Sequence, residues 1–399
     1  MSNESAQSTP SEAASLSAAP IVIIGSGLAA FTVAKEVRKL APQQAITLIS
    51  REQGFFYAKP GLSNAFGAGK NPAQLIGSEQ EKMASQFNLQ IVPHTDVTKI
   101  DAAQKTIETS QGSMSYSQLV LALGADPIRL PIEGNAADQI LSINDWQDYA
   151  DFRQALEGKK RVAIMGAGLI GCEFANDLVL AAYEVDVIDP SAQALGRLLP
   201  PVAGQKLQTA LANAGVQWHL GKSVQSVSRL ANGSLELGLS DGTLLSTELL
   251  LSAVGLKPRT ALAAASGITV NRGIVVNRHL QTNLPHIFAL GDCAEVDGLV
   301  LPYVMPIMNA ARALAPTLLG QPTAVNYPAM PVGVKTPALP VVVSPPAIGQ
   351  TGQWIETETT DGVEALFKDE DGNLKGFALL GTATSQKASL TKLLPPLLA

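Results

Sequence analysis

Residues 161–178 read RVAIMGAGLIGCEFANDL, an apolar run that turns over three glycines into a helical pattern. Gly166, Gly168 and Gly171 are spaced as G-x-G-x-x-G, with Leu169 and Ile170 as the x-x pair. In such a turn the first glycine permits the bend, the second lets the backbone approach a pyrophosphate, and the third lets the helix pack close to the strand. The stretch therefore predicts a strand, a phosphate-binding turn and a helix.

The strand expected next supplies a carboxylate at the right place. EVDVIDP ends at Asp189, 23 residues after Gly166, which suits an acid that binds a ribose. A carboxylate there would repel a 2′-phosphate, so NADH is favoured over NADPH. Arg197, eight residues further on, could soften that preference.

A second copy of the pattern occupies residues 20–36, PIVIIGSGLAAFTVAKE. Here Gly25, Gly27 and Ala30 form G-x-G-x-x-A after a strand-like IVII, and a periodic stretch to Leu40 predicts the helix. AITLIS predicts the next strand, after which Glu52 could accept hydrogen bonds from a ribose or be a solvated loop acid. Two such patterns about 140 residues apart indicate two separate dinucleotide-binding domains.

Composition narrows the class of protein. The net charge of −6 argues against a nucleic-acid partner, and no run approaches the ~18 apolar residues of a membrane helix. Residues 1–19 resemble a disordered Ser/Ala tail, and the chain has only Cys172 and Cys293, so we expect a cytoplasmic location. The four histidines are scattered without metal-ligand spacing, so no metal site is expected.

The motifs together resemble those of the flavoprotein disulfide reductase superfamily, in its ferredoxin and rubredoxin reductase branch. The resemblance runs from about residue 21 to 399 and rests on motifs in the family's order: GSGLAA, YAKPGLS, LVLALGADP, GAGLIGCEFA, LLSAVGLKPR, IFALGDCAEV, YVMPIM and VKTPALPVVVSPP. It implies an α/β protein with two Rossmann-like domains and a C-terminal α+β interface domain. The expected FAD domain comprises residues 20–125 and 254–330, the inserted NAD domain 126–253, and the interface domain 331–399.

The resemblance also implies roles for individual residues. At the FAD pyrophosphate it places the first turn, from Gly25 through Ser26, Gly27 and Leu28 to Ala29. Other FAD contacts would come from Arg51 and Glu52 at the ribose, Val97 at the adenine, Arg129 at the phosphates, Asp292 at the ribityl chain, and Val304 and Lys335 at the flavin ring. NADH would lie against the second turn, with Gly255 in AVGLKPR beside it. VLALGAD departs from the family's usual A-T-G by placing a leucine at position 123.

Two further residues are expected at the reacting part of the flavin. By resemblance, Glu173 occupies the position of a glutamate that pairs with a lysine, and Lys59 in YAKP is the expected partner. An ammonium there would stabilise the negative charge that hydride transfer places on the flavin. The same YAKPGLSNAF segment has no cysteine, so electrons would pass directly to an external acceptor.

The implied activity is FAD-dependent transfer of electrons from NADH to rubredoxin, with alkane hydroxylation as a plausible use. Ferredoxin or flavorubredoxin reduction is the nearest alternative, and an FAD/NADH redox-sensing protein is an alternative of another class. No Asp or Glu follows residue 371, whereas Lys375, Lys387 and Lys392 do. These lysines could form a solvated basic face or meet an acidic partner. A monomer is compatible with this function.

Overall fold

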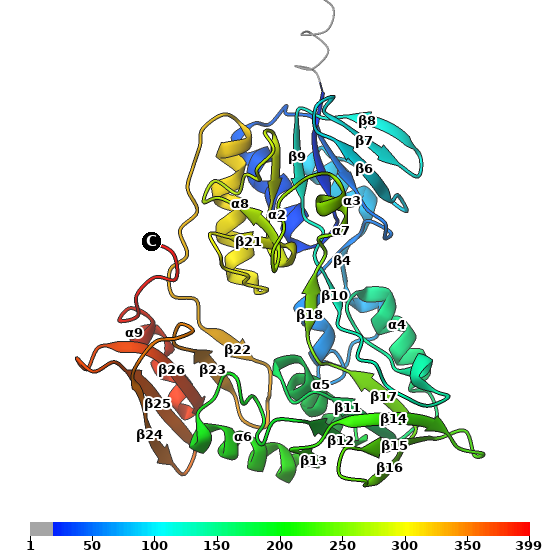
Figure 1. Cartoon of the computed structure of the whole chain (residues 1–399), viewed down its shortest axis with the longest axis vertical. Helices are drawn as coiled ribbons and strands as arrows, with labels where there is room; N and C mark the ends of the chain where they lie inside the picture. Colours follow the sequence, from blue (N-terminus) through cyan, green and yellow to red (C-terminus); the bar gives the residue numbers. More distant parts are fainter. Residues whose placement is uncertain (1–18) are drawn as a thin grey trace, which may run out of the picture. The chain divides into compact units, whose positions relative to one another are not determined.

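The structure is a computed structural model that describes residues 19–399, and it divides into two compact units (Figure 1). The expected N-terminal tail lies outside the described residues, apart from residue 19. Within the described chain, the first unit comprises residues up to Tyr57, Gly77–Ala125 and Pro258–Asn326. The second unit comprises Ala58–Ile76, Asp126–Lys257 and Tyr327–Ala399.

A five-stranded parallel sheet forms the centre of the first unit. Its order is β20 (Ile287–Ala289), β9 (Gln118–Leu121), β1 (Ile21–Ile24), β2 (Ile46–Ile49) and β5 (Gln90–Val92). All four residues of the central β1 are buried, which explains why IVII is uniformly apolar: it is covered on both faces.

Helices α2 (Leu28–Leu40) and α8 (Val304–Leu318) pack against each other in this unit. The buried face of α2 is rich in alanine, which lets another helix approach closely. Shorter elements complete the unit: α3 (Gln80–Phe87), α7 (Ala261–Ala265), η4 (Gly291–Cys293), β3 (Phe56–Tyr57), β4 (Ile76–Ser78), β6 (Val97–Asp101), β7 (Thr106–Thr109), β8 (Gly112–Ser115), β19 (Ile274–Val276) and β21 (Ala294–Val296). The strand and helix expected around the first glycine turn are confirmed.

A second parallel sheet lies in the second unit, with four strands. Its order is β13 (Val216–Leu220), β12 (Glu184–Asp189), β11 (Arg161–Met165) and β17 (Leu249–Ser252). Around it lie α4 (Trp146–Ala155), α5 (Leu169–Leu180), α6 (Pro201–Ala214), η3 (Ala137–Gln139), and the antiparallel strands β14 (Val224–Arg229), β15 (Leu235–Leu239) and β16 (Leu244–Thr247). Helix α4 begins at a capping box in which Asp145 and Asp148 each accept a backbone N–H of the other.

The C-terminal part of this unit is an antiparallel sheet. The strands follow the order β22 (Val332–Val334), β23 (Val341–Ser344), β26 (Leu374–Gly381), β25 (Gly362–Lys368) and β24 (Gln353–Thr359). The DEDGN segment, residues 369–373, joins β25 to β26, and the chain after β26 forms a 3₁₀ turn, η5 (Thr382–Gln386), followed by α9 (Lys387–Thr391). Strand β24 holds α6 through Glu356, which accepts from the N–H groups of Val202 (3.3 Å) and Ala203 (2.9 Å).

The two units differ from the sequence-based division, since residues 327–399 share a unit with residues 126–257 and a further segment changes its unit. Residues 58–76 were expected within the FAD domain, yet they belong to the second unit, where η1 (Lys59–Asn64) and η2 (Ala73–Leu75) lie. Asp177 of α5 holds the segment because its carboxylate accepts the N–H groups of Phe66 (3.0 Å) and Gly67 (2.7 Å). Two of the chain's passages between the units lie in β10 (Ala125–Pro127) and β18 (Leu256–Pro258), which pair with each other.

Candidate functional site

The first glycine turn has the shape that a pyrophosphate requires. Gly25 adopts φ 128°, and a Cβ there would lie 2.3 Å from the Ala122 carbonyl oxygen, so only glycine fits. At Gly27 a Cβ would meet nothing within 4 Å, which leaves open space at the start of α2. This helix has no side-chain cap and no acid in its first turn, so its N–H groups can receive an anion.

Hydrogen bonds join the ends of β1 and β2 beside this turn. The Ser26 and Ser50 hydroxyl oxygens lie 2.7 Å apart, and the Glu52 N–H donates to Ser50 Oγ at 3.0 Å. His94 and Thr95 donate their N–H groups to the carbonyls of Glu52 and Ser50, at 3.1 and 2.8 Å. The segment leading to Val97 therefore lies beside Glu52 and exposed Arg51, as an adenosine site would need.

Asp292 also lies near the first turn. Gly291 adopts φ 79°, and a Cβ added to it would lie 3.1 Å from Ala29 Cβ, so η4 approaches the start of α2. Val304, the first residue of α8, is 40% exposed, so its side chain is available for contact. The structure thus brings Asp292 close to the Gly25–Ala29 turn.

The second glycine turn repeats this geometry in the other unit. A Cβ on Gly166, at φ 108°, would lie 2.6 Å from the Ala253 carbonyl, and one on Gly171 would lie 1.9 Å from the Gly166 carbonyl. Gly168 again faces open space, and α5 has no side-chain cap and no acid in its first turn. This arrangement is typical of a dinucleotide-binding site, here called a dinucleotide clamp: a glycine turn, the uncapped start of a helix and open space beside them.

Asp189 ends β12 beside this turn. Its Oδ2 accepts the Ala167 N–H at 2.6 Å and its Oδ1 accepts the Ser191 N–H at 2.7 Å. The carboxylate therefore fixes the turn and keeps further acceptor capacity on each oxygen. Exposed Arg197 follows on the loop after β12, and Gly255, at φ 116°, follows β17.

A buried polar cluster surrounds Glu173 of α5. Glu173 is fully buried, and its Oε2 accepts the Ser63 hydroxyl and the Lys335 ammonium, each at 2.5 Å. The Lys335 N–H donates to Oε1 at 2.9 Å, and its ammonium also donates to Ser63 Oγ at 3.1 Å. Three segments far apart in the sequence, η1, α5 and the loop after β22, meet at this carboxylate.

The hydrogen bonds of the structure give Glu173 and Lys59 other partners than the expected pairing of these two residues. Lys335, expected at the flavin ring, is the lysine that pairs with Glu173. Its backbone N–H donates to the same carboxylate, so the loop after β22 holds the ammonium beside it. The Lys59 ammonium instead donates to Asn144 Oδ1 at 2.6 Å. Asn144 is itself buried and its N–H donates to Asp148 at 2.8 Å, so Lys59 is anchored to the start of α4.

The remaining candidates are Arg129 and the two cysteines. Exposed Arg129 belongs to the second unit, where it donates to the Ile140 carbonyl at 3.1 Å, so a phosphate contact stays a prediction. Burial raises the pKa of Cys172 to about 12 and that of Cys293 to about 11, so both thiols stay protonated at neutral pH. Among residues 19–399 no group of three or more His, Cys, Asp or Glu side chains could hold a metal.

Sequence reasoning missed Ser63, Asn144 and Arg259. Arg259, in LKPRT, donates to the carbonyl of Leu123, the residue that departs from the family's pattern, at 2.9 Å. Arg259 and Ser63 had a signal, because they end the quoted motifs LLSAVGLKPR and YAKPGLS. Asn144 lies in none of the quoted motifs and gave no signal.

Two open glycine turns, each at the carboxyl edge of a parallel sheet and each beside a strand-end carboxylate, define a protein built to bind two dinucleotides. The model of the pyridine nucleotide-disulphide oxidoreductase family matches residues 19–315, and the chain belongs to that family. A model described as the rubredoxin-binding C-terminal domain matches residues 324–394. The family expected from the motifs is therefore confirmed.

Individual relatives cover almost the whole chain. A rubredoxin-NAD(+) reductase of Alcanivorax borkumensis is 46% identical, over 95% of this chain and 99% of its own length. A nitric oxide reductase FlRd-NAD(+) reductase of Aeromonas salmonicida is 39% identical, over 94% and 96%. The solved covalent putidaredoxin reductase–putidaredoxin complex is 25% identical over 94% of both chains, with a TM-score of 0.85. Within residues 19–399 no helix has the length and apolarity needed to cross a membrane.

Proposed function

We propose that this chain is an FAD-dependent enzyme that takes electrons from NADH and passes them singly to rubredoxin. The observation that carries the proposal is the match of residues 324–394 to a rubredoxin-binding domain on a chain with two dinucleotide clamps. The 46% identical rubredoxin-NAD(+) reductase supports it. The proposed division is an FAD domain of residues 20–125 and 254–330, an NAD domain of residues 126–253 and an interface domain of residues 331–399.

The residues of the first unit fit FAD. The open space at Gly27 and the uncapped start of α2 suit its pyrophosphate. Glu52 is proposed to bind the adenosine ribose, with Val97 at the adenine edge and Asp292 at the ribityl chain. Bound FAD supplies a ring that accepts a hydride from NADH and releases electrons one at a time, which joins a two-electron donor to a one-electron iron centre.

The residues of the second unit fit NADH. The start of α5 would bind its pyrophosphate, and Gly168 leaves room for the close approach. Asp189 would accept the ribose hydroxyls on the lone pairs that its two backbone contacts leave free, and it would repel the 2′-phosphate of NADPH.

The buried Glu173 cluster is proposed to place a positive charge where the reaction needs it. Glu173 and Ser63 fix the Lys335 ammonium, while Asn144 fixes that of Lys59. Held ammonium groups stabilise developing negative charge without reorganising during the reaction. Neither cysteine can relay electrons as a thiolate, because both are buried and protonated. The acceptor must therefore be external.

Stopped-flow mixing of the flavin-loaded, NADH-reduced protein with rubredoxin tests the proposal. We expect rapid reoxidation with one rubredoxin reduced per electron, and NADH to be preferred over NADPH as donor. A clear preference for ferredoxin would overturn the choice of acceptor. Reduced flavin that persists for minutes beside rubredoxin would instead favour a redox-sensing protein.

Flavorubredoxin is the second candidate acceptor, because the 39% identical relative is named a nitric oxide reductase FlRd-NAD(+) reductase. The same stopped-flow assay with a flavorubredoxin compares the two acceptors directly. A cytoplasmic location and a supply of electrons to alkane hydroxylation also belong to the proposal. Two reduced, buried cysteines are compatible with a reducing compartment. Normal growth of a deletion strain on alkanes would contradict the proposed supply of electrons to alkane hydroxylation.

A further inference from the structure

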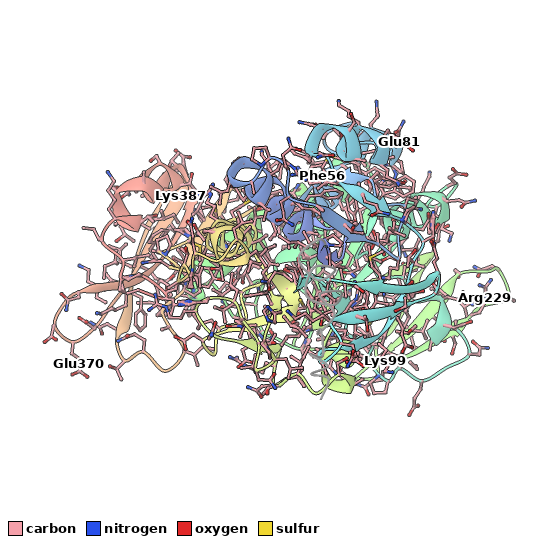
Figure 2. All side chains as sticks on the ribbon, turned by 90° about the horizontal axis from the view of Figure 1, so that it is seen from above. Phe56, Glu81, Lys99, Arg229, Glu370 and Lys387 are labelled. Carbon is pink, nitrogen blue, oxygen red and sulfur yellow. The ribbon has the colours of Figure 1, made fainter. Side chains whose placement is uncertain are left out.

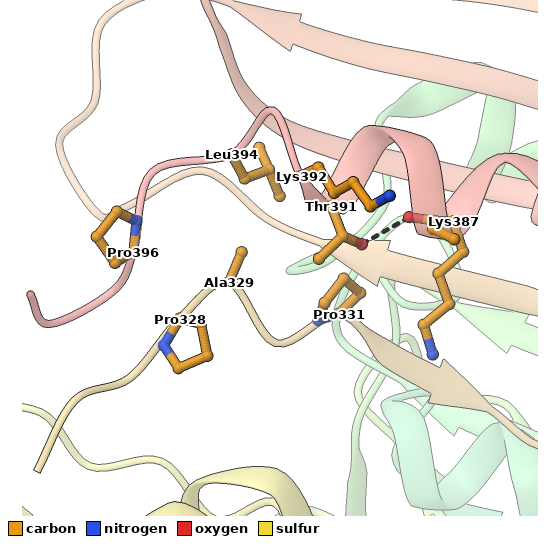
Figure 3. Close-up of a pocket in the computed structure, with 9 residues that line it drawn as sticks. Pro328, Ala329, Pro331, Lys387, Thr391, Lys392, Leu394 and Pro396 are labelled. Atoms are coloured by element: carbon orange, nitrogen blue, oxygen red, sulfur yellow. Dashed lines mark hydrogen bonds between the residues drawn. The ribbon is translucent and has the colours of Figure 1, made fainter.

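A surface pocket of about 480 Å³ lies within the second unit, between α9 and the chain that leads into β22 (Figure 3). One wall is the segment before β22, and the other is α9 with the residues after it. The residues that line the pocket are Pro328, Ala329, Pro331, Lys387, Ala388, Thr391, Lys392, Leu394 and Pro396.

The two walls are joined by backbone hydrogen bonds. The Tyr327 N–H donates to the Leu398 carbonyl at 2.8 Å, and the Leu397 N–H donates to the Tyr327 carbonyl at 2.7 Å. Tyr327 is 3% exposed, so this clasp is anchored in the core. Prolines fix the backbone of both walls. The pocket is thus largely formed before any partner binds, which lowers the entropic cost of binding.

The charge of the pocket is entirely positive. Its lining holds two lysines and no acid, and the ammonium groups of exposed Lys387 and Lys392 form no ion pair with any described residue. Lys375, by contrast, is neutralised by Asp369 at 3.2 Å. Glu370, in the nearest acidic turn along the chain, lies well apart from Lys387 in Figure 2. A positive site therefore stands on a protein whose net charge is −6.

Apolar groups accompany the two lysines. Leu393 is 65% exposed and Leu397 is 43% exposed, on either side of Leu394 and Pro396 in the pocket wall. An apolar centre with charges at its rim is the usual composition of a protein–protein interface. A small anion would need only the lysines, so the exposed leucines favour a protein partner.

We propose that this pocket, with Lys387 and Lys392 at its rim, is the docking surface for rubredoxin, which meets it with a face of carboxylates around an apolar centre. The inference rests on the proposed function, and it assigns to particular residues a role that the family model gives only to residues 324–394 as a whole. The lysines attract the partner at long range, and the preformed apolar wall holds it.

Charge reversal tests the docking surface. The flavin-loaded variants Lys387→Glu, Lys392→Glu and the double variant are compared with Lys82→Glu, which reverses an exposed lysine on α3. We expect the KM for rubredoxin to rise about tenfold or more in the double variant, less in each single one, and not at all in Lys82→Glu. The wild-type KM should rise with ionic strength, and that dependence should weaken in the double variant. Reduction of the flavin by NADH, measured in each preparation, serves as the reference rate.

The outcomes separate the two proposals. Rubredoxin reduction by the wild type with an equal KM in the double variant, or with an equal rise in Lys82→Glu, overturns the docking surface and leaves the proposed function intact. A wild type that does not reduce rubredoxin overturns both. If the double reversal fails to hold flavin, the double glutamine variant decides: a KM for rubredoxin at least about threefold above the wild type supports a requirement for positive charge, and an equal KM overturns the docking surface.

Discussion

At the scale of single residues, the carboxylate of Glu173 joins two other side chains of the candidate site. It is fully buried and accepts from Ser63 and from both the ammonium and the N–H of Lys335. A buried carboxylate needs such partners, because removing an ion from water costs several kcal/mol. Changing this residue should therefore alter both stability and charge placement.

We expect Glu173→Gln to fold but to bind the Lys335 ammonium more weakly. An amide keeps the shape of the side chain but cannot hold the lysine with a full negative charge, so a loss of about 1–3 kcal/mol in unfolding free energy should follow. The rate of flavin reduction by NADH should fall by about tenfold or more. Thermal melts and stopped-flow reduction measure the two effects, and Ser63→Ala should show a smaller change in the same direction. A Glu173→Gln rate equal to that of the wild type would contradict the role.

Asp189 is the residue expected to choose between the two nicotinamide cofactors. Asp189→Asn removes the negative charge and one of the two acceptors of backbone N–H groups, since an amide nitrogen cannot accept. We expect NADH affinity to fall by about tenfold and the preference over NADPH to narrow, since an unmet N–H costs about 1–3 kcal/mol. Titration of the flavin-loaded protein with each cofactor measures this. Arg197→Ala is the control, and NADPH binding that depends on Arg197 alone would show that Asp189 is not the discriminating group.

At the scale of elements, the turn before α5 separates a packing role from a binding role. Gly171 faces the Gly166 carbonyl, whereas Gly168 faces open space. We expect Gly168→Ala to fold with an unchanged melting temperature but to bind NADH at least about tenfold more weakly, because its methyl group occupies the room for the pyrophosphate.

Gly171→Ala should instead push α5 away from its strand. A Cβ cannot lie 1.9 Å from a carbonyl oxygen, so the variant should lose stability as well as NADH affinity. Calorimetry and NADH titration on both glycine variants distinguish the two cases. If Gly168→Ala destabilised the fold as strongly as Gly171→Ala, the open space at this turn would have been misassigned.

Helix α6 depends on a carboxylate from another part of the chain. Glu356 on β24 accepts two N–H groups at the start of α6, a helix that begins at a proline and has no side-chain cap of its own. We expect Glu356→Ala to cost about 1 kcal/mol, seen as a lower melting temperature. Glu358→Ala, which removes only the partly exposed ion pair with Lys206, should cost about 0.5 kcal/mol or less. Equal losses would mean that α6 needs no cap from β24.

At the scale of the whole molecule, sequence reasoning succeeded where spacing carries the information. Both turns, their strands and their helices were predicted because glycine positions and apolar periodicity are local signals. The hydrogen bonds by which Asp177 holds residues 58–76 were missed, since they join residues that lie 110 and 111 positions apart in the sequence. The choice between Lys59 and Lys335 as the partner of Glu173 was also beyond the sequence, because either ammonium is chemically suitable and only tertiary packing selects one.

The path of electrons through the molecule gives the last prediction. Burial raises the pKa of Cys172 to about 12 and of Cys293 to about 11, so the folded protein favours the neutral thiols. Their contribution to stability is complete below the thiol pKa of the unfolded chain, about 8.5, and is lost as pH rises towards those folded values. Thiol-alkylating reagents should therefore label neither cysteine in the native protein at pH 7, and both after unfolding, as mass spectrometry can show.

The double variant Cys172→Ala, Cys293→Ala should still pass electrons from NADH to rubredoxin at about the wild-type rate, because neither sulfur is a relay. Both side chains are small and buried, so a modest loss of stability of about 1–2 kcal/mol for each is expected from the cavities. Flavin content is measured first, so that a folding defect is not mistaken for a lost relay. A flavin that NADH reduces normally but that no longer reduces rubredoxin in this variant would restore a sulfur to the pathway and contradict direct transfer to an external acceptor.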